Sequence, residues 1–282
     1  MYNKEDIGNY YNTTQVHYEQ WWDLNKSFSL HYGIWEENTK NFKEALANTN
    51  KIMMELANIN SSSKVLDAGC GVGGAAVFIH EQNGAFVTGI TLSQKQLDSA
   101  NKLVTEKGLS DQVKFKLMDY TQTTFPDESF DVIWACESIC HSPEPIKFMN
   151  EAHRLLKKGG RLVICDFFKT SEDQIDKNDW LQKWCDTWAV TKLRTSMDFK
   201  KGLEENGFTN TKVLDYTSKI QKSAQRMYYS SLLAVLPSEI YKLINPGVSK
   251  FARNHYKCGI YQYKALNANL WKYKIIFSIK NT

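Results

Sequence analysis

A glycine-rich turn at residues 65–74 is the feature that most constrains what this chain can fold into. It reads Val-Leu-Asp-Ala-Gly-Cys-Gly-Val-Gly-Gly, so that an apolar run ends in Asp67 and is followed by Gly69, Gly71 and Gly73. Glycine lacks a Cβ, which lets the backbone turn sharply and approach a ligand closely. The third glycine comes one position too early for a dinucleotide-binding G-x-G-x-x-G, and the Gly-Lys-Ser/Thr ending of a P-loop is missing. The turn therefore predicts contact with another kind of ligand, or else an ordinary strand-turn-helix.

Strands and helices alternate after this turn. Further strands are expected at 85–90, 113–118, 130–135 and 161–166, helices at 93–107 and 146–156, and a turn at 157–160. Such alternation predicts a parallel sheet with helices on both faces. Ligands of these sheets bind over the carboxyl ends of the strands. The side chains expected there are Asp67, Thr91, Asp119 and Glu137.

The core, roughly residues 62–168, resembles the class I methyltransferases that use S-adenosylmethionine (SAM). The resemblance rests on the glycine turn and on Gly89-Ile90-Thr91-Leu92-Ser93, Gln96, Asp119, Phe125-Pro126-Asp127 and Leu155-Leu156-Lys157-Lys158-Gly159-Gly160. It implies a Rossmann-like, seven-stranded, mostly parallel sheet in an α/β fold. It also implies SAM as the cofactor and S-adenosylhomocysteine as the product.

Thr91 departs from the pattern of that family, because many members have an acid here that holds both ribose hydroxyls. A threonine hydroxyl brings no charge, so ribose binding is expected to depend on Gln96 or on backbone groups. The Ile-Thr-Leu-Ser-x-x-Gln version is similar to that of tocopherol methyltransferases and cyclopropane fatty-acid synthases. The cofactor site implied by the resemblance consists of Asp67, Gly69, Gly71, Gly73, Thr91, Leu92, Gln96, Asp119, Tyr120, Cys136, Tyr10 and Tyr32.

The segment Glu137-Ser138-Ile139-Cys140-His141 follows the fourth strand and is the expected catalytic segment. Methyl transfer requires a nucleophile held about 3 Å from the methyl carbon, in line with the sulfur. His141 could take a proton from the acceptor near neutral pH. Glu137 could hold that base, bind an amine or stabilise a carbocation. The structural alternatives are a capping or SAM-contacting role for His141 and a contact between Glu137 and the N-terminal segment.

The Glu-Ser-x-x-His-x-Pro arrangement resembles sterol C-methyltransferases and tocopherol O-methyltransferases alike. It therefore leaves open whether carbon, oxygen or nitrogen is methylated. A compact set of carboxylates and amides for Mg²⁺ is not evident at the strand ends, so no metal is expected.

Four segments are expected along the chain. Residues 1–60 form an N-terminal helical lid segment, 61–170 the SAM-binding core, 171–250 a helical acceptor-binding insert with strand six near 207–216, and 251–282 the C-terminal part that closes the sheet. The strand near 207–216 and the run at 271–279 are expected to be the closing antiparallel strands. The aromatic side chains of the first segment either line the acceptor pocket or fasten its helices to the core. The first segment also resembles the residues before the core in sterol and tocopherol methyltransferases.

Aromatic residues are the expected contacts of the acceptor. They are Trp22, Trp184, Trp188 and Tyr228. Trp180, Trp184 and Trp188 share one helix face, which more often marks core packing. Residues 231–244 could form an apolar helix that caps the pocket or touches a membrane surface, although Pro237 is expected to break any long version.

Composition narrows the remaining possibilities. The chain has 282 residues, 42% of them hydrophobic, with a net charge of +4 spread along its length. It lacks a run of about 20 apolar residues and an apolar signal core at the N-terminus, so a cytoplasmic protein is expected. The six cysteines form no Cys-x-x-Cys pair, and reduced thiols are expected. Scattered lysines argue against a nucleic-acid partner, and the oligomeric state stays open.

The sequence thus predicts a SAM-dependent methyltransferase. Its acceptor is expected to be small and largely apolar, such as a prenyl, sterol-like, quinol or other secondary metabolite. One alternative is methylation of an alkene through a cation, as in cyclopropane synthases. Another is a SAM-binding protein that has lost catalysis, although the intact glycine turn together with Glu137 and His141 argues against it.

Overall fold

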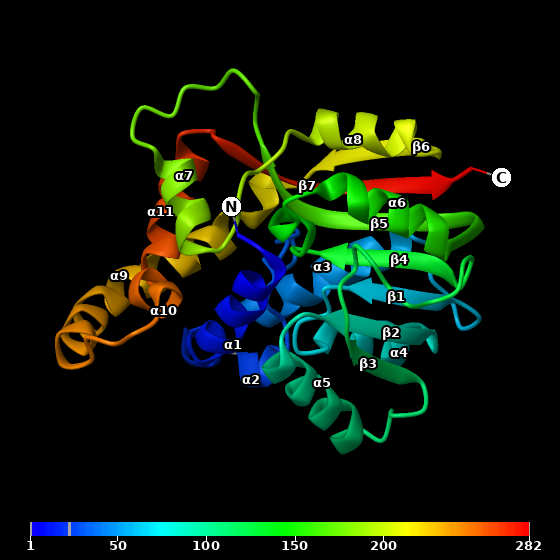
Figure 1. Ribbon diagram of the computed structural model, residues 1–282, viewed down its shortest axis with the longest axis horizontal. Coiled ribbons are helices and arrows are strands. Elements are labelled where there is room, and N and C mark those ends of the chain that lie inside the picture. The colour runs from blue at the N-terminus through cyan, green and yellow to red at the C-terminus, as the bar shows by residue number, and fades with distance from the viewer. Residues whose placement is uncertain (1, 22–23, 282) are drawn as a thin grey trace.

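A seven-stranded sheet runs through the computed structural model, which describes residues 2–21 and 24–281 (Figure 1). The strand order is β3-β2-β1-β4-β5-β7-β6. The strands are β1 (Lys64–Ala68), β2 (Phe86–Thr91), β3 (Val113–Leu117), β4 (Phe130–Cys136), β5 (Leu156–Lys169), β6 (Phe208–Asp215) and β7 (Trp271–Lys280). The pairs that β7 forms with β5 and β6 are antiparallel, and the other four pairs are parallel. The mostly parallel, Rossmann-like sheet expected from the sequence is confirmed.

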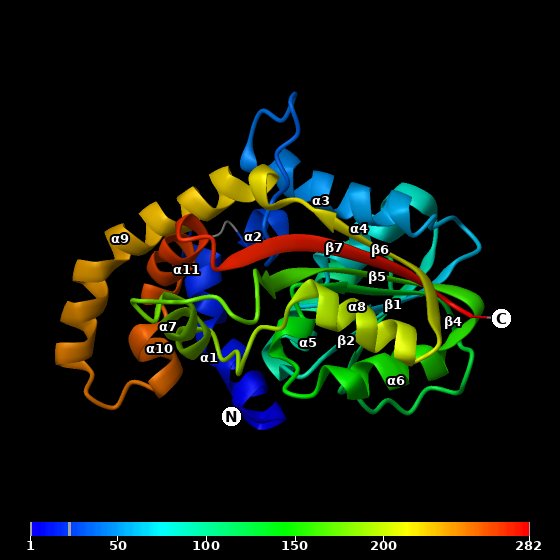
Figure 2. The same ribbon diagram turned by 90° about the horizontal axis from the view of Figure 1, so that it is seen from above.

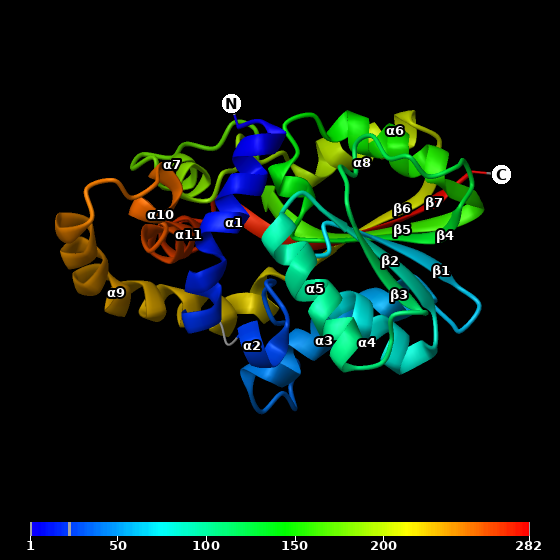
Figure 3. The same cartoon turned by 60° about the horizontal axis from the view of Figure 1, so that its bottom comes forward.

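Both faces of the central strands are buried, which explains why β4 is apolar almost throughout, whereas the edge strands β3 and β6 carry exposed polar residues. In β4, Val132 and Trp134 belong to one hydrophobic cluster, whereas Ile133 and Ala135 belong to another. The helices α3 (Phe42–Leu56) and α4 (Gly74–Asn83) lie on one face, and α6 (Pro145–Leu155) and α8 (Ser196–Glu205) lie on the other (Figures 2 and 3). Helix α5 (Gln94–Glu106) packs against β2 and β3.

A second group of helices lies beyond the carboxyl ends of the parallel strands (Figure 1). It consists of α1 (Lys4–Trp21), α2 (Leu24–Ser27), α7 (Trp180–Thr187), α9 (Gln221–Ile244), α10 (Lys250–Asn254) and α11 (Lys257–Asn267). Short 3₁₀ helices at Ile139–His141 and Thr217–Ile220 complete the secondary structure. The second group of helices continues to Asn267, and β7 follows it. Among the described residues, no helix is both long enough and apolar enough to cross a membrane.

Two local expectations were wrong. The turn expected at 157–160 lies inside β5, where Gly159 has a φ of +71° and the register with β4 shifts. Pro237 does not end α9; its ring is exposed, and the helix bends along its length instead (Figure 2). The two strands expected to close the sheet, β6 and β7, do pair with each other in antiparallel fashion.

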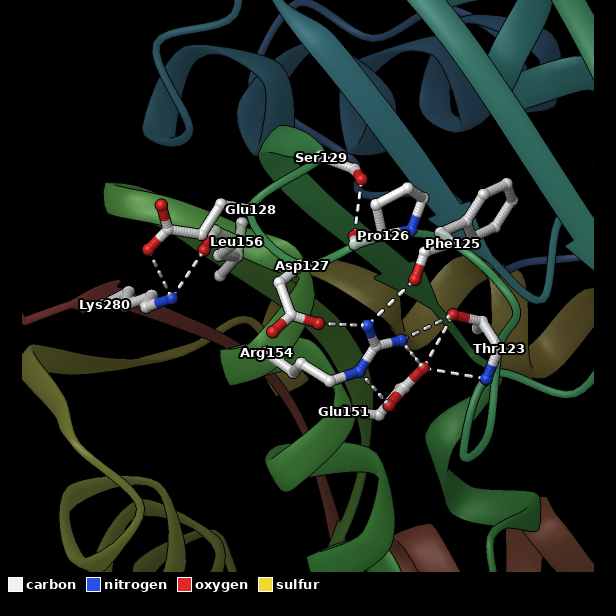
Figure 4. A network of polar contacts seen from close by, with 10 residues as sticks. All are labelled: Thr123, Phe125, Pro126, Asp127, Glu128, Ser129, Glu151, Arg154, Leu156 and Lys280. Carbon is white, nitrogen blue, oxygen red and sulfur yellow. Dashed lines mark hydrogen bonds and ion pairs between the residues drawn. The ribbon is translucent and has the colours of Figure 1, made fainter.

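An arginine network fastens the loop between β3 and β4 to α6 (Figure 4). Arg154 donates to the Phe125 carbonyl at 2.8 Å, to Asp127 at 2.6 Å and to Glu151 at 2.7 Å. The Glu151 carboxylate in turn accepts from the backbone and hydroxyl of Thr123. The network holds the end of a loop whose start, at Tyr120, belongs to the candidate site.

Candidate active site

A cavity lies over the carboxyl ends of β1, β2 and β4 and is covered by the N-terminal segment. We call it the cofactor cavity. Its walls include Asp67, Gly69, Gly71, Thr91, Leu92, Gln96, Tyr120, Cys136, Glu137, His141 and Trp188. All eleven are side chains or glycines that the sequence analysis singled out, so the tertiary structure brings most of the expected site together.

The glycine turn needs glycine for its own packing. Gly69, Gly71 and Gly73 have φ angles of +93°, +53° and +88°, a region that other residues rarely adopt. A Cβ on Gly69 would lie 2.4 Å from the Ser138 Cβ, and one on Gly73 would lie 2.6 Å from the Phe115 ring. The turn therefore fits tightly against the protein itself, whereas the sequence argument considered only a ligand.

Two buried acceptor atoms in the cavity wall have no hydrogen-bond partner among the residues that the structure describes. They are Oδ2 of Asp67 and Nε2 of His31. Burial raises the pKa of Asp67 to about 7 and lowers the pKa of His31 to about 4. The Nδ1–H of His31 donates to the Tyr32 carbonyl at 2.9 Å, which leaves Nε2 as an acceptor. SAM carries an ammonium group and hydroxyls that could donate to such atoms, so the residues present fit this cofactor.

The Thr91 hydroxyl donates to Oε1 of Gln96 at 2.7 Å and accepts from the Ser93 backbone at 3.1 Å. Both side chains are buried, and both line the cavity. Because Thr91 holds the amide oxygen, the Gln96 amide nitrogen remains the donor for a ligand. This geometry supports the expectation that ribose contacts depend on Gln96.

His141 forms a dyad with Tyr11, a residue that the sequence analysis did not assign to the site. The Nδ1–H of His141 donates to the Ala189 carbonyl at 3.3 Å, so Nε2 carries the lone pair. The Tyr11 hydroxyl donates to this Nε2 at 2.8 Å. Burial lowers the pKa of His141 to about 4, which keeps the ring neutral near pH 7. Both side chains line the cofactor cavity, and the dyad can therefore accept a proton there.

Glu137 is tied to the N-terminal segment. Its Oε1 accepts from the Tyr32 backbone and from the Tyr273 hydroxyl, both at 2.6 Å. Its φ is +50°, an unfavourable value for this residue type, and burial raises the pKa of its carboxyl. Glu137 thus connects the end of β4 to the segment that covers the cavity.

A larger cavity of about 600 Å³ lies between α1 and the helices α9, α10 and α11. We call it the acceptor cavity. Tyr18 lines this cavity and the cofactor cavity, so its side chain stands where the two meet. Hydroxyl groups of Ser230, Ser231, Ser238, Tyr241 and Tyr256 line it together with apolar groups.

Tyrosines and histidines form a chain of contacts at this wall. The Tyr18 hydroxyl lies 3.1 Å from that of Tyr10, which lies 2.9 Å from Nε2 of His255. The Nδ1 atoms of His255 and His17 lie 3.0 Å apart, so one ring donates to the other. Burial lowers the pKa of His255 to about 3. These contacts connect α1 to His255, which lies between α10 and α11, beside the place where the two cavities meet.

Several expected site residues lie away from the cofactor cavity. Gly73 caps α4, and Asp119 forms an ion pair with Lys4. Trp184 stacks on Trp188 at 5.3 Å. Tyr228 packs on Tyr263. Trp22 lies outside the described residues.

Tyr10 and Tyr32 also lie outside the lining of the cofactor cavity, although both are buried nearby. Tyr10 belongs to the chain of tyrosine and histidine contacts described above. The backbone N–H of Tyr32 donates a hydrogen bond to Glu137. The adjacent Tyr11 and the neighbouring His31 line the cavity instead. The pairs Tyr10-Tyr11 and His31-Tyr32 indicated that this region contributes to the site. The sequence does not say which member of each pair faces the cavity. Among the described residues, no group of three His, Cys, Asp or Glu side chains could hold a metal ion.

Known proteins share this core. Residues 66–164 match the family model described as a methyltransferase domain. The chain is 33% identical over 162 residues to 27-O-demethylrifamycin SV methyltransferase from Amycolatopsis mediterranei, covering 57% of this chain and 58% of that protein. It is 32% identical over 162 residues to a probable tocopherol O-methyltransferase from Oryza sativa, covering 55% and 45%.

The match spans about half the length of these curated relatives. The fold extends further: the cyclopropane synthase MmaA2 from Mycobacterium tuberculosis has a TM-score of 0.84 at 16% identity, over 99% of this chain and 98% of that one. At this identity the likeness concerns the fold alone. The match to the methyltransferase domain covers residues 66–164, which hold the glycine turn and strands β2 to β4.

Proposed function

We propose that this protein transfers the methyl group of SAM to a hydroxyl of a largely apolar, oxygen-bearing small molecule. The observation that carries the proposal is the Tyr11–His141 dyad, whose two side chains line the same cavity as the glycine turn. Transfer to a hydroxyl requires loss of its proton, and a neutral imidazole can take it. Transfer to an alkene would instead need a charged group beside a cation. Glu137 is occupied as an acceptor for Tyr32 and Tyr273.

The dyad can move a proton in either of two ways. An acceptor hydroxyl can replace the Tyr11 hydroxyl at Nε2 of His141, or it can pass its proton to the Tyr11 oxygen while Tyr11 passes its own to Nε2. In both cases the Ala189 carbonyl fixes the ring and stabilises the imidazolium that forms. SAM supplies the activated methyl group and the leaving sulfur. The remaining task of the chain is to hold the two reactants in line.

The acceptor cavity supports the proposed substrate class. A volume of about 600 Å³ suits a molecule larger than an amino acid or a simple phenol. Its wall mixes the hydroxyl-bearing residues named above with Val16, Met227 and Ala234, and it also includes Lys242 and Arg253. Such a wall suits an apolar skeleton that carries oxygen groups. Relatives named for rifamycin and tocopherol methylation agree with this class.

The test begins with calorimetric titration of S-adenosylhomocysteine. Labelled SAM is then incubated with phenols, quinols, sterols and hydroxylated macrolactones, and products are screened by mass spectrometry for the gain of one methylene. O-methylation is expected, and a product methylated on carbon would contradict the proposal. Ala234→Trp, which fills the acceptor cavity, should lower kcat/KM for the acceptor at least tenfold. It should leave the affinity for S-adenosylhomocysteine unchanged. Leu232→Trp, on the same helix but outside the cavity wall, is the matched control.

A further inference from the structure

Helix α9 turns small and hydroxyl-bearing side chains toward the protein and large apolar side chains toward solvent. Its inner side faces the acceptor cavity with Ser231, Ala234 and Ser238. Its outer side exposes Tyr229, Leu233, Leu236, Ile240, Leu243 and Ile244, which we call the outer face. The exposed fractions reach 71% for Leu233, 69% for Leu236 and 84% for Leu243. The spacing of three and four residues places these six side chains on one stripe of the helix.

An apolar stripe of this length is costly to leave in water. Helix α9 extends to the end of the molecule farthest from the sheet, as Figures 1 and 2 show. Its exposed stripe is therefore open to a flat partner. The helix, which contains Pro237, also bends along the outside of the molecule (Figure 2).

The charge of this region selects the kind of partner. Residues 221–258 contain six basic residues, Lys222, Arg226, Lys242, Lys250, Arg253 and Lys257, and one acidic residue, Glu239. The formal charge of the segment is therefore +5, against +4 for the whole chain, so the rest of the chain carries −1. Two copies meeting at this face would bring two such segments together and repel each other. An anionic surface is complementary to it.

We propose that the outer face of α9 docks on an anionic lipid surface. Leucine and isoleucine side chains enter the acyl boundary, and the net charge of +5 on residues 221–258 attracts anionic headgroups. Lys222 is exposed on the same helix, whereas Lys242 and Arg253 line the acceptor cavity. Because the inner side of the same helix lines the acceptor cavity, docking places that cavity beside the lipid layer. Delivery of an apolar acceptor from this layer rests on the proposed function, whereas the docking does not.

The experiment is co-sedimentation of the full chain with vesicles. One set consists of phosphatidylcholine alone and the other contains about one quarter phosphatidylglycerol. We expect binding at least tenfold stronger to the anionic vesicles and weakened several-fold by high salt. The double variant Leu233→Glu with Leu236→Glu should lose at least tenfold in binding. The control is Ile175→Glu with Met197→Glu, which changes the net charge equally at exposed apolar positions away from α9.

Three results would overturn the proposal. They are no binding of the unaltered protein to anionic vesicles, equal binding to both vesicle sets, and equal loss in both double variants. Light scattering then identifies the alternative, since a dimer dissociated by the α9 variant would show that a second copy covers the face. S-adenosylhomocysteine binding and the thermal unfolding midpoint, measured on each variant, report folding and the cofactor site. Loss of vesicle binding is therefore distinguishable from failure of the proposed methyl transfer.

Discussion

The hydroxyl of Tyr11 lies 2.8 Å from Nε2 of His141, although 129 residues separate them in the chain. Tyr11 comes from α1, and His141 comes from the 3₁₀ helix after β4. The N-terminal segment, which lies over the sheet, therefore brings Tyr11 to His141 and forms the candidate base. Occupation of Nε2 by Tyr11 also means that an incoming acceptor meets a prepared hydrogen-bonding pair.

Tyr11→Phe and His141→Ala should each lower kcat about 10²–10⁴-fold, the usual contribution of a positioned base. The cofactor affinity should stay within a few-fold of the original. Because the pKa of His141 lies near 4, the rate of the unaltered enzyme should hold through neutral pH and fall as the pH drops toward 4. Initial rates over pH check this, with Tyr2→Phe as a control that removes a hydroxyl bonded to Asp186 instead. Full activity of both dyad variants would contradict the assignment.

Asp67→Asn should weaken binding of S-adenosylhomocysteine while stabilising the empty protein at alkaline pH. The pKa of Asp67 is about 7 when folded and near 3.8 when unfolded. The folded state thus binds more protons, and this contribution to stability is full below about pH 4 and lost as the pH rises through 7. Asparagine carries no charge, so its gain should be about 2–4 kcal/mol at pH 8 and vanish in acid. Denaturant unfolding at two pH values measures the difference, and a gain independent of pH would exclude this cause.

Gly69→Ala should destabilise the protein by about 3 kcal/mol or more, because it combines a positive φ with a clash against Ser138. Gly108→Ala is the matched control. Its φ is +68°, but nothing lies within 4 Å of the added Cβ. The control should therefore cost only about 1 kcal/mol, the price of the backbone conformation. Equal losses of stability would show that close packing of the turn is unimportant.

Glu137→Gln separates two roles for this carboxyl. A glutamine oxygen can still accept from the Tyr32 backbone and the Tyr273 hydroxyl, so the segment should stay closed and kcat should change only a few-fold. Glu137→Ala leaves both donors without a partner and should increase hydrogen exchange at residues 28–34. A large fall in kcat for the glutamine variant, with unchanged exchange, would instead favour cation stabilisation and alkene methylation.

The glycine turn and the local alternation of strands and helices were sufficient to predict the sheet, since its central strands are largely apolar and several helices carry their own side-chain caps. Ser93 and Thr195, for example, cap α5 and α8 with their own side chains. Errors arose where context outweighed local preference. Residues 157–160 lie within β5 at a shift in its register with β4, and Pro237 lies within α9 with an exposed ring.

The sequence by itself determined the cofactor end of the site, because the carboxyl ends of β1, β2 and β4 meet at one edge of any sheet with this strand order. Only the tertiary structure decided that Tyr11 rather than Tyr10 faces the cofactor cavity, that Tyr18 stands between the two cavities, and that α9 turns its leucines outward. These choices depend on the rotation of α1 and α9 about their axes. Packing against distant segments sets that rotation, and neighbours in the chain do not.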